Sequence, residues 1–215
     1  IHEATDAGED AGFNRVVDYW EDGTDTQWID TVAEVRRVPW SATFISWVLN
    51  QAGHLDEFTP GVAHRQFFSD GVRERQQNTN SPFKTYDVRE NQTQVGEVAI
   101  AKRGDSNIDN NSVEHAEGAT HSDIITEINA ETRVVTLIGG NVSQSVDRST
   151  ATLDENGFMT PGPYWALLRI GGPGPTDDGS TDVLFRVRVV SETLNVRETP
   201  YVLRNPNTNP GGEQN

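Results

Sequence analysis

The segment from residue 39 to 53, PWSATFISWVLNQAG, constrains the fold most, because it predicts a helix whose buried face begins at a serine. The members of that face recur at steps of three and four residues: Ser41, Phe44, Ile45, Val48 and Ala52. Pro39 suits a helix start and Gly53 a helix end. Ser41 is therefore expected to point into the fold, beside backbone N–H groups that a helix leaves unpaired.

Two interpretations of Ser41 follow from this position. As an N-cap, the hydroxyl of Ser41 would accept a hydrogen bond from one of those N–H groups. As a nucleophile, it would attack a carbonyl whose developing negative charge the helix terminus stabilises. Only the partners of Ser41 can decide between the two.

A predicted β-hairpin supplies candidate partners for Ser41. Residues 120–128 alternate: His121, Asp123, Ile125 and Glu127 are expected on one face, and Ser122, Ile124, Thr126 and Ile128 on the other. A turn at 129–132 and the run RVVTLIGGN complete the hairpin, which can bring Asn141 near His121. An amide or carboxylate fixes the tautomer of a catalytic imidazole, so Asn141 and Asp123 compete for that role. The alternative is that His121 is a structural polar residue.

Several short motifs together resemble the papain-like cell-wall hydrolases of the CHAP and NlpC type. Within that group the chain is most similar to a bacterial domain of unknown function, family 2272, in which serine also replaces the usual cysteine. The resemblance covers about residues 13–170, and His64 in GVAHR also looks like part of the narrower pattern. The motifs that carry it are PWSAxFISW from Pro39, GEV from Gly96, THxD from Thr120 and IGGN from Ile138.

The resemblance implies an α+β fold with N-terminal helices packed on a small antiparallel sheet. It assigns Ser41 as nucleophile, His121 as base, and Asn141 or Asp123 as the residue that orients His121. The implied reaction is cleavage of a peptide or amide bond of peptidoglycan, by an amidase or endopeptidase. Four further residues are expected at the substrate: Trp40, Ala42, His64 and Gly140.

The serine at position 41 leaves a second outcome open. A thiol is partly ionised at neutral pH, whereas a hydroxyl needs a well-aligned base to remove its proton. Either the site works as a Ser-His-Asn arrangement, or hydrolysis is lost and the domain binds wall fragments or a partner, for instance in a phage tail or secretion apparatus. A third possibility is an effector delivered to the wall of another cell. No cysteine elsewhere in the chain can supply a thiol.

Charge and composition limit the partners. With 33 acidic and 17 basic residues, the net charge of −16 opposes binding to nucleic acid. No apolar run has the length of a membrane span. We expect an extracytoplasmic protein, whether secreted, periplasmic or virion-associated, without cofactor or metal, since the acidic loop before His121 fits a calcium motif only in part. Because the chain does not begin with Met, a fragment or a processed chain is expected, which leaves an upstream signal or domain open, and a larger assembly is left open as well.

Composition divides the chain into a hydrolase-like domain at 1–171, a Gly/Pro/Asp linker at 172–182 and a C-terminal segment at 183–215. LNVR from Leu194 resembles the opening of a bacterial Src-homology-3-like barrel, but the remaining length allows only a partial module with a disordered tail. Inside the first domain, helices are expected from Phe13 and over 64–76. A polar loop is expected at 77–94, before a first strand near 95–104.

Overall fold

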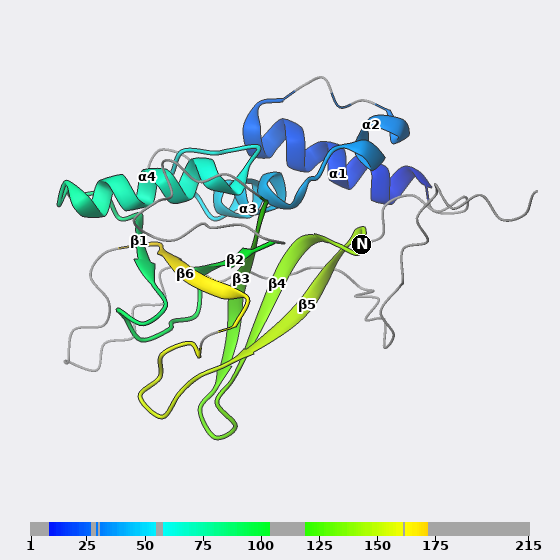
Figure 1. Ribbon diagram of the computed structural model, residues 1–215. Helices are drawn as coiled ribbons and strands as arrows, with labels where there is room; N and C mark the ends of the chain where they lie inside the picture. The colour runs from blue at the N-terminus through cyan, green and yellow to red at the C-terminus, as the bar shows by residue number, and fades with distance from the viewer. Residues whose placement is uncertain are drawn as a thin grey trace, which may run out of the picture.

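The computed structural model describes residues 9–26, 29, 31–54, 58–103, 119–160 and 162–171. These residues form an α+β fold in which the helices lie along one side of an antiparallel sheet (Figure 1). The helices are α1 (Glu9–Thr24), α2 (Val32–Arg37), α3 (Ser41–Gln51) and α4 (His64–Gln76). The strands are β1 (Lys84–Asp87), β2 (Val98–Lys102), β3 (Thr120–Asn129), β4 (Val134–Val142), β5 (Ser145–Thr152) and β6 (Tyr164–Arg169). Their order in the sheet is β1-β6-β2-β3-β4-β5.

The expected helices are confirmed. The apolar face of α3 is buried, and α4 occupies the range that its periodicity predicts. The short helix α2 begins with a capping box, in which the Thr31 hydroxyl accepts from the Glu34 N–H and the Glu34 carboxylate accepts from the Thr31 N–H. Helix α2 therefore starts where its local sequence satisfies the first backbone donors.

Strand β1 corrects the expectation of a loop over residues 77–94. It has four residues, and only Thr85 is buried among them. The Thr85 hydroxyl donates to the backbone oxygen of Phe68 in α4 at 3.1 Å, and Gly71 of α4 leaves the room for that contact. The strand is polar, lies at the sheet edge and is fixed by a helix, so its sequence has no hydrophobic alternation from which a strand could be predicted.

The predicted hairpin is confirmed as the antiparallel pair β3–β4. A bulge shifts the register between Ile125 and Glu127, so the simple alternation fails beyond that point. Ile124 packs toward the helices, whereas Ile125 and Ile128 both contact the second core cluster on the other face of the sheet. The prediction that Ile128 shares the face of Ile124 is therefore wrong.

The sheet is strongly curved, which lets distant strands meet. Three strands separate β6 from β5 in the sheet order, yet the hydroxyls of Tyr164 in β6 and Ser149 in β5 lie 2.9 Å apart. This curvature encloses the second core cluster, while the first lies between the sheet and the helices. The candidate site lies at the start of β3, where side chains from both faces of the sheet take part.

The expected linker at 172–182 and the C-terminal segment at 183–215 lie outside the described residues, as does the acidic loop that follows Arg103. The proposed domain boundaries therefore stay predictions.

Candidate functional site

Ser41 is the first residue of α3, not its N-cap. Trp40 occupies the N-cap position, and no side chain caps the helix. Ser41 is 4% exposed, so its hydroxyl lies inside the protein, at the helix end where the first N–H groups lack intrahelical partners. The interpretation of Ser41 as a simple cap is therefore wrong.

The hydroxyl of Ser41 contacts an imidazole from another helix. Ser41 Oγ lies 2.7 Å from Nε2 of His64, the first residue of α4. Nδ1 of the same ring lies 2.5 Å from Oγ of Ser122 in β3. We call Ser41, His64 and Ser122 the hydroxyl network. When Ser41 donates to Nε2, the ring proton sits on Nδ1 and is donated to Ser122.

The surroundings of His64 keep its imidazole neutral. Burial lowers the pKa of His64 well below 6.5, and the nearby charges of His121 and Arg103 lower it further. Its ring contacts the rings of Phe67 and Phe68, at centroid distances of 5.8 and 6.2 Å. A position at the amino end of a helix also disfavours a cation. A neutral ring nitrogen facing a hydroxyl is the form that can accept a proton.

His121 belongs to a different network. Its Nε2 lies 2.9 Å from Oδ1 of Asp123, and Oδ2 of Asp123 accepts hydrogen bonds from Tyr164 and, at 3.3 Å, from Ser149. We call His121, Asp123, Ser149 and Tyr164 the carboxylate network. Nδ1 of His121 is buried and has no hydrogen-bond partner in the described part of the chain.

The two glycines of the IGGN motif explain how the hairpin reaches this position. A Cβ on Gly139 would lie 1.7 Å from Asp123 Oδ1 and 2.9 Å from His121 Nε2. A Cβ on Gly140 would lie 2.5 Å from Cβ of Phe44 in α3. Gly139 thus makes room for the carboxylate network, and Gly140 lets β4 approach the helix that carries Ser41.

The hydroxyl and carboxylate networks meet, but not through Ser41. The rings of His64 and His121 lie 5.8 Å apart at 72°, an edge-to-face contact. Across the described residues, no hydrogen bond joins Ser41 to His121. The expected pairing of Ser41 with His121 is thus replaced by one with His64, because α4 begins beside α3 and brings its first side chain to the hydroxyl.

The structure places Asp123, the second candidate orienter, on Nε2 of His121. Among the hydrogen bonds of the described residues, none joins Asn141 to His121, whose Nε2 lies 2.9 Å from Oδ1 of Asp123. The register of β4 shifts between Gly139 and Val142, and Asn141 takes the left-handed φ of 58°. That bulge changes the direction in which the side chain leaves the strand. Of the two competing orienters, the structure therefore pairs His121 with Asp123.

The residues expected at the substrate occupy different settings. Trp40 and Ala42 are buried in the core cluster beneath the helices, and the Trp40 ring packs on Tyr19 at 5.6 Å. Gly140 is buried against Phe44, and His64 contacts Ser41 directly. The structure gives His64 the most direct link to the candidate chemistry and makes Trp40 a packing residue.

Sequence reasoning missed Ser122, Ser149 and Tyr164 as members of the site. Ser122 carries a usable signal, since alternation places it on the face opposite His121, toward the helices. Ser149 and Tyr164 carry none, because only the curvature of the sheet brings them to Asp123.

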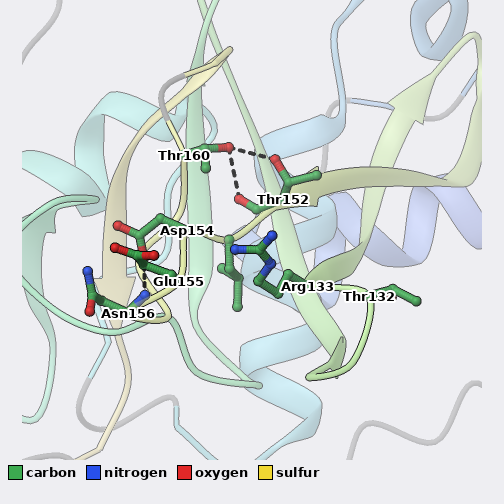
Figure 2. Close-up of a pocket in the computed structure, with 8 residues that line it drawn as sticks. Thr132, Arg133, Thr152, Asp154, Glu155, Asn156 and Thr160 are labelled. Atoms are coloured by element: carbon green, nitrogen blue, oxygen red, sulfur yellow. Dashed lines mark hydrogen bonds between the residues drawn. The ribbon is translucent and has the colours of Figure 1, made fainter.

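An open hollow of about 500 Å³ lies at the other end of the long hairpin (Figure 2). It is lined by polar side chains of the β3–β4 turn and of the segment after β5, among them Arg133, Asp154 and Asn156. Eight residue steps along β3 separate His121 from Asn129, a span of roughly 26 Å at the usual strand rise. The hollow is thus separate from both networks.

Among the described residues, no group of three or more His, Asp or Glu side chains could hold a metal ion. Within the same residues, every helix is too short or too polar to cross a membrane.

One comparison with known proteins identifies the family. The family described as "uncharacterized protein conserved in bacteria (DUF2272)" matches residues 7–183. The chain belongs to this family. No curated protein and no solved structure matches it. The family match spans both networks, and it assigns no reaction to them.

Proposed function

We propose that this family member is a hydrolase that cleaves amide bonds with Ser41 as nucleophile. The observation that supports the proposal is the 2.7 Å contact between Ser41 Oγ and Nε2 of His64 at the start of α3. A hydroxyl paired with a neutral imidazole, beside unpaired helix N–H groups, is the arrangement that acyl transfer needs.

In the proposed reaction, Ser41 attacks the carbonyl carbon while its proton passes to Nε2 of His64. Ser122 accepts the Nδ1–H of His64 and keeps the ring oriented, which replaces the orienting role first expected of Asn141. The backbone N–H groups at the start of α3, around Ser41 and Ala42, stabilise the oxyanion. His64 then gives its proton to the departing amine, and water releases the acyl group by the reverse sequence.

The proposed substrate class is the peptide and amide bonds of peptidoglycan. This part of the proposal relies on the resemblance of the PWSAxFISW and IGGN motifs to papain-like cell-wall hydrolases. It also carries the proposal of a papain-like fold and of an extracytoplasmic location. The arrangement of helices first and antiparallel sheet second is compatible with that fold.

The burial of the hydroxyl network favours a second candidate, a binding or structural module without catalysis. Ser41, His64 and Ser122 are 4%, 5% and 0% exposed, values that a purely structural polar network would also show. In that case the three residues would satisfy one another's hydrogen bonds, and wall fragments or a partner protein would bind elsewhere on the surface.

Digestion of purified peptidoglycan separates the two candidates. The parent protein is expected to release new amino groups, and Ser41→Ala is expected to release none. Ser46→Ala is the matched control, because Ser46 is a buried serine of the same helix whose hydroxyl hydrogen-bonds to the backbone of Gly61. Loss of amine release in Ser41→Ala but not in Ser46→Ala supports hydrolysis. Equal binding with no release by any of the three proteins overturns it.

A further inference from the structure

Four strands converge on one buried carboxylate. Asp123 in β3 is 2% exposed and is bonded by His121 of the same strand, by Ser149 of β5 and by Tyr164 of β6. Gly139 of β4 leaves the room in which Asp123 Oδ1 and His121 Nε2 meet. The proposed hydrolysis by Ser41 and His64 makes no use of these side chains.

The two oxygens of Asp123 are divided between different donors. Oδ2 accepts from the hydroxyls of Tyr164 and Ser149, which also lie 2.9 Å from each other. Oδ1 is thereby left for His121, whose Nε2 lies 2.9 Å away. In the neutral form of the His121 ring, the proton sits on Nε2, which faces the carboxylate, and Nδ1 is then a hydrogen-bond acceptor.

We propose that Tyr164 and Ser149 are positioning residues, which act through Asp123 to hold His121 with a bare Nδ1 that accepts the N–H of the substrate amide. The proposal rests on the proposed function for its substrate. Nδ1 is buried and has no partner among the described residues, and the His121 ring contacts that of His64 at 5.8 Å. A buried acceptor without a donor is costly unless a ligand supplies one.

This arrangement makes the site selective for amides over esters. An ester has no N–H, so it gains nothing from Nδ1 of His121, whereas a secondary amide gains one buried hydrogen bond. A site built around such a bond discriminates against the analogue that lacks the group. The selectivity therefore reports on His121 and its supports rather than on the Ser41 hydroxyl itself.

The kinetic test compares an acylated dipeptide with its ester isostere. Tyr164→Phe and Ser149→Ala are expected to lower the amide-to-ester ratio of kcat/KM about tenfold, the equivalent of one hydrogen bond, and Ser149→Thr is expected to restore it. Tyr86→Phe is the matched control, a tyrosine of the same sheet that stacks under Arg75 and Arg169. An unchanged ratio in Tyr164→Phe and Ser149→Ala overturns the proposal, and so does an equal drop in the control.

Nitrogen-15 NMR of the His121 ring tests the same proposal without turnover. The parent is expected to show the proton on Nε2, and Tyr164→Phe a mixture of tautomers. A proton on Nδ1 in the parent contradicts the positioning role. If the parent cleaves neither substrate, the proposed function fails, and the NMR result alone then decides whether Tyr164 sets the tautomer.

Discussion

The two buried imidazoles of this fold have opposite partners. His64 lies between two hydroxyls, Ser41 and Ser122, whereas His121 faces the carboxylate of Asp123. His64 is thereby a neutral ring in contact with a candidate nucleophile. In His121, Nε2 faces the carboxylate of Asp123, and Nδ1 has no hydrogen-bond partner among the described residues. Ser41 contacts His64 rather than His121 because helix α4 begins next to α3 and carries His64 as its first residue.

The largest expected effect is a difference in hydrolysis rate between variants that lack His64 and variants that lack His121. His64→Ala is expected to lower the rate of peptidoglycan amine release by about 10³-fold, since it removes the proposed proton acceptor of Ser41. His121→Ala is expected to lower it about tenfold through loss of one substrate hydrogen bond. His54→Ala, a histidine outside both networks, is the control for removal of an imidazole. A larger loss in His121→Ala than in His64→Ala would reverse the assignment.

Gly139→Ala in β4 is expected to disturb the carboxylate network. Its Cβ would lie 1.7 Å from Asp123 Oδ1, so the Asp123 and His121 side chains must move. We expect the free energy of unfolding in urea to fall by about 1–3 kcal/mol. In Gly162→Ala the new Cβ would meet only the backbone oxygen of Thr160 at 3.8 Å, and a change of less than about 0.5 kcal/mol is expected. Equal effects at the two glycines would argue against a tight contact at Gly139.

Removing one serine from each network is expected to lower the free energy of unfolding by different amounts. Ser122→Ala leaves Nδ1 of buried His64 without its partner, at an expected cost of about 1–3 kcal/mol in the free energy of unfolding. Ser149→Ala is expected to cost only about 0.5–1.5 kcal/mol, because Asp123 keeps its hydrogen bonds to Tyr164 and His121. Denaturant unfolding of both variants measures the difference, and a larger cost for Ser149→Ala would contradict it.

A last expected effect is a pH dependence of stability that comes from His64. Burial holds the folded-state pKa of His64 below its unfolded value near 6.5, so below that pH the unfolded chain binds a proton that the folded protein rejects. Stability from this group is present above about pH 6.5 and is lost as the pH falls, by at most about 1.4 kcal/mol per pH unit. His64→Gln is expected to flatten that slope between pH 6.5 and 5 in urea unfolding. An identical slope would show that His64 is protonated in the folded protein.

The parts of the fold that were predictable from the sequence are those with strong local patterns. Helices α3 and α4 and the β3–β4 hairpin follow from apolar spacing and turn residues. Strand β1 was missed because only Thr85 is buried in it, and Ile128 was placed on the wrong face because a bulge adds a residue to β3. Neither the polar edge strand nor the bulge can be recognised from the spacing of apolar residues.

The candidate site was predictable in its residues more than in its pairings. Ser41, His64, His121 and Asp123 all lie in the two networks. The pairings depend on where α4 starts and on how far the sheet curls, so the sequence could not give the Ser41–His64 contact. The bulge at Asn141 is likewise a property of the β4–β5 pairing.

Covalent labelling with a fluorophosphonate, which reacts with activated serine hydroxyls, tests most directly whether His64 activates Ser41. Mass spectrometry of the labelled peptides would locate the adduct in the parent, in His64→Ala and in His121→Ala. An adduct on Ser41 is expected in the parent and in His121→Ala, and none is expected in His64→Ala. Labelling of Ser41 that survives in His64→Ala and disappears in His121→Ala would contradict it.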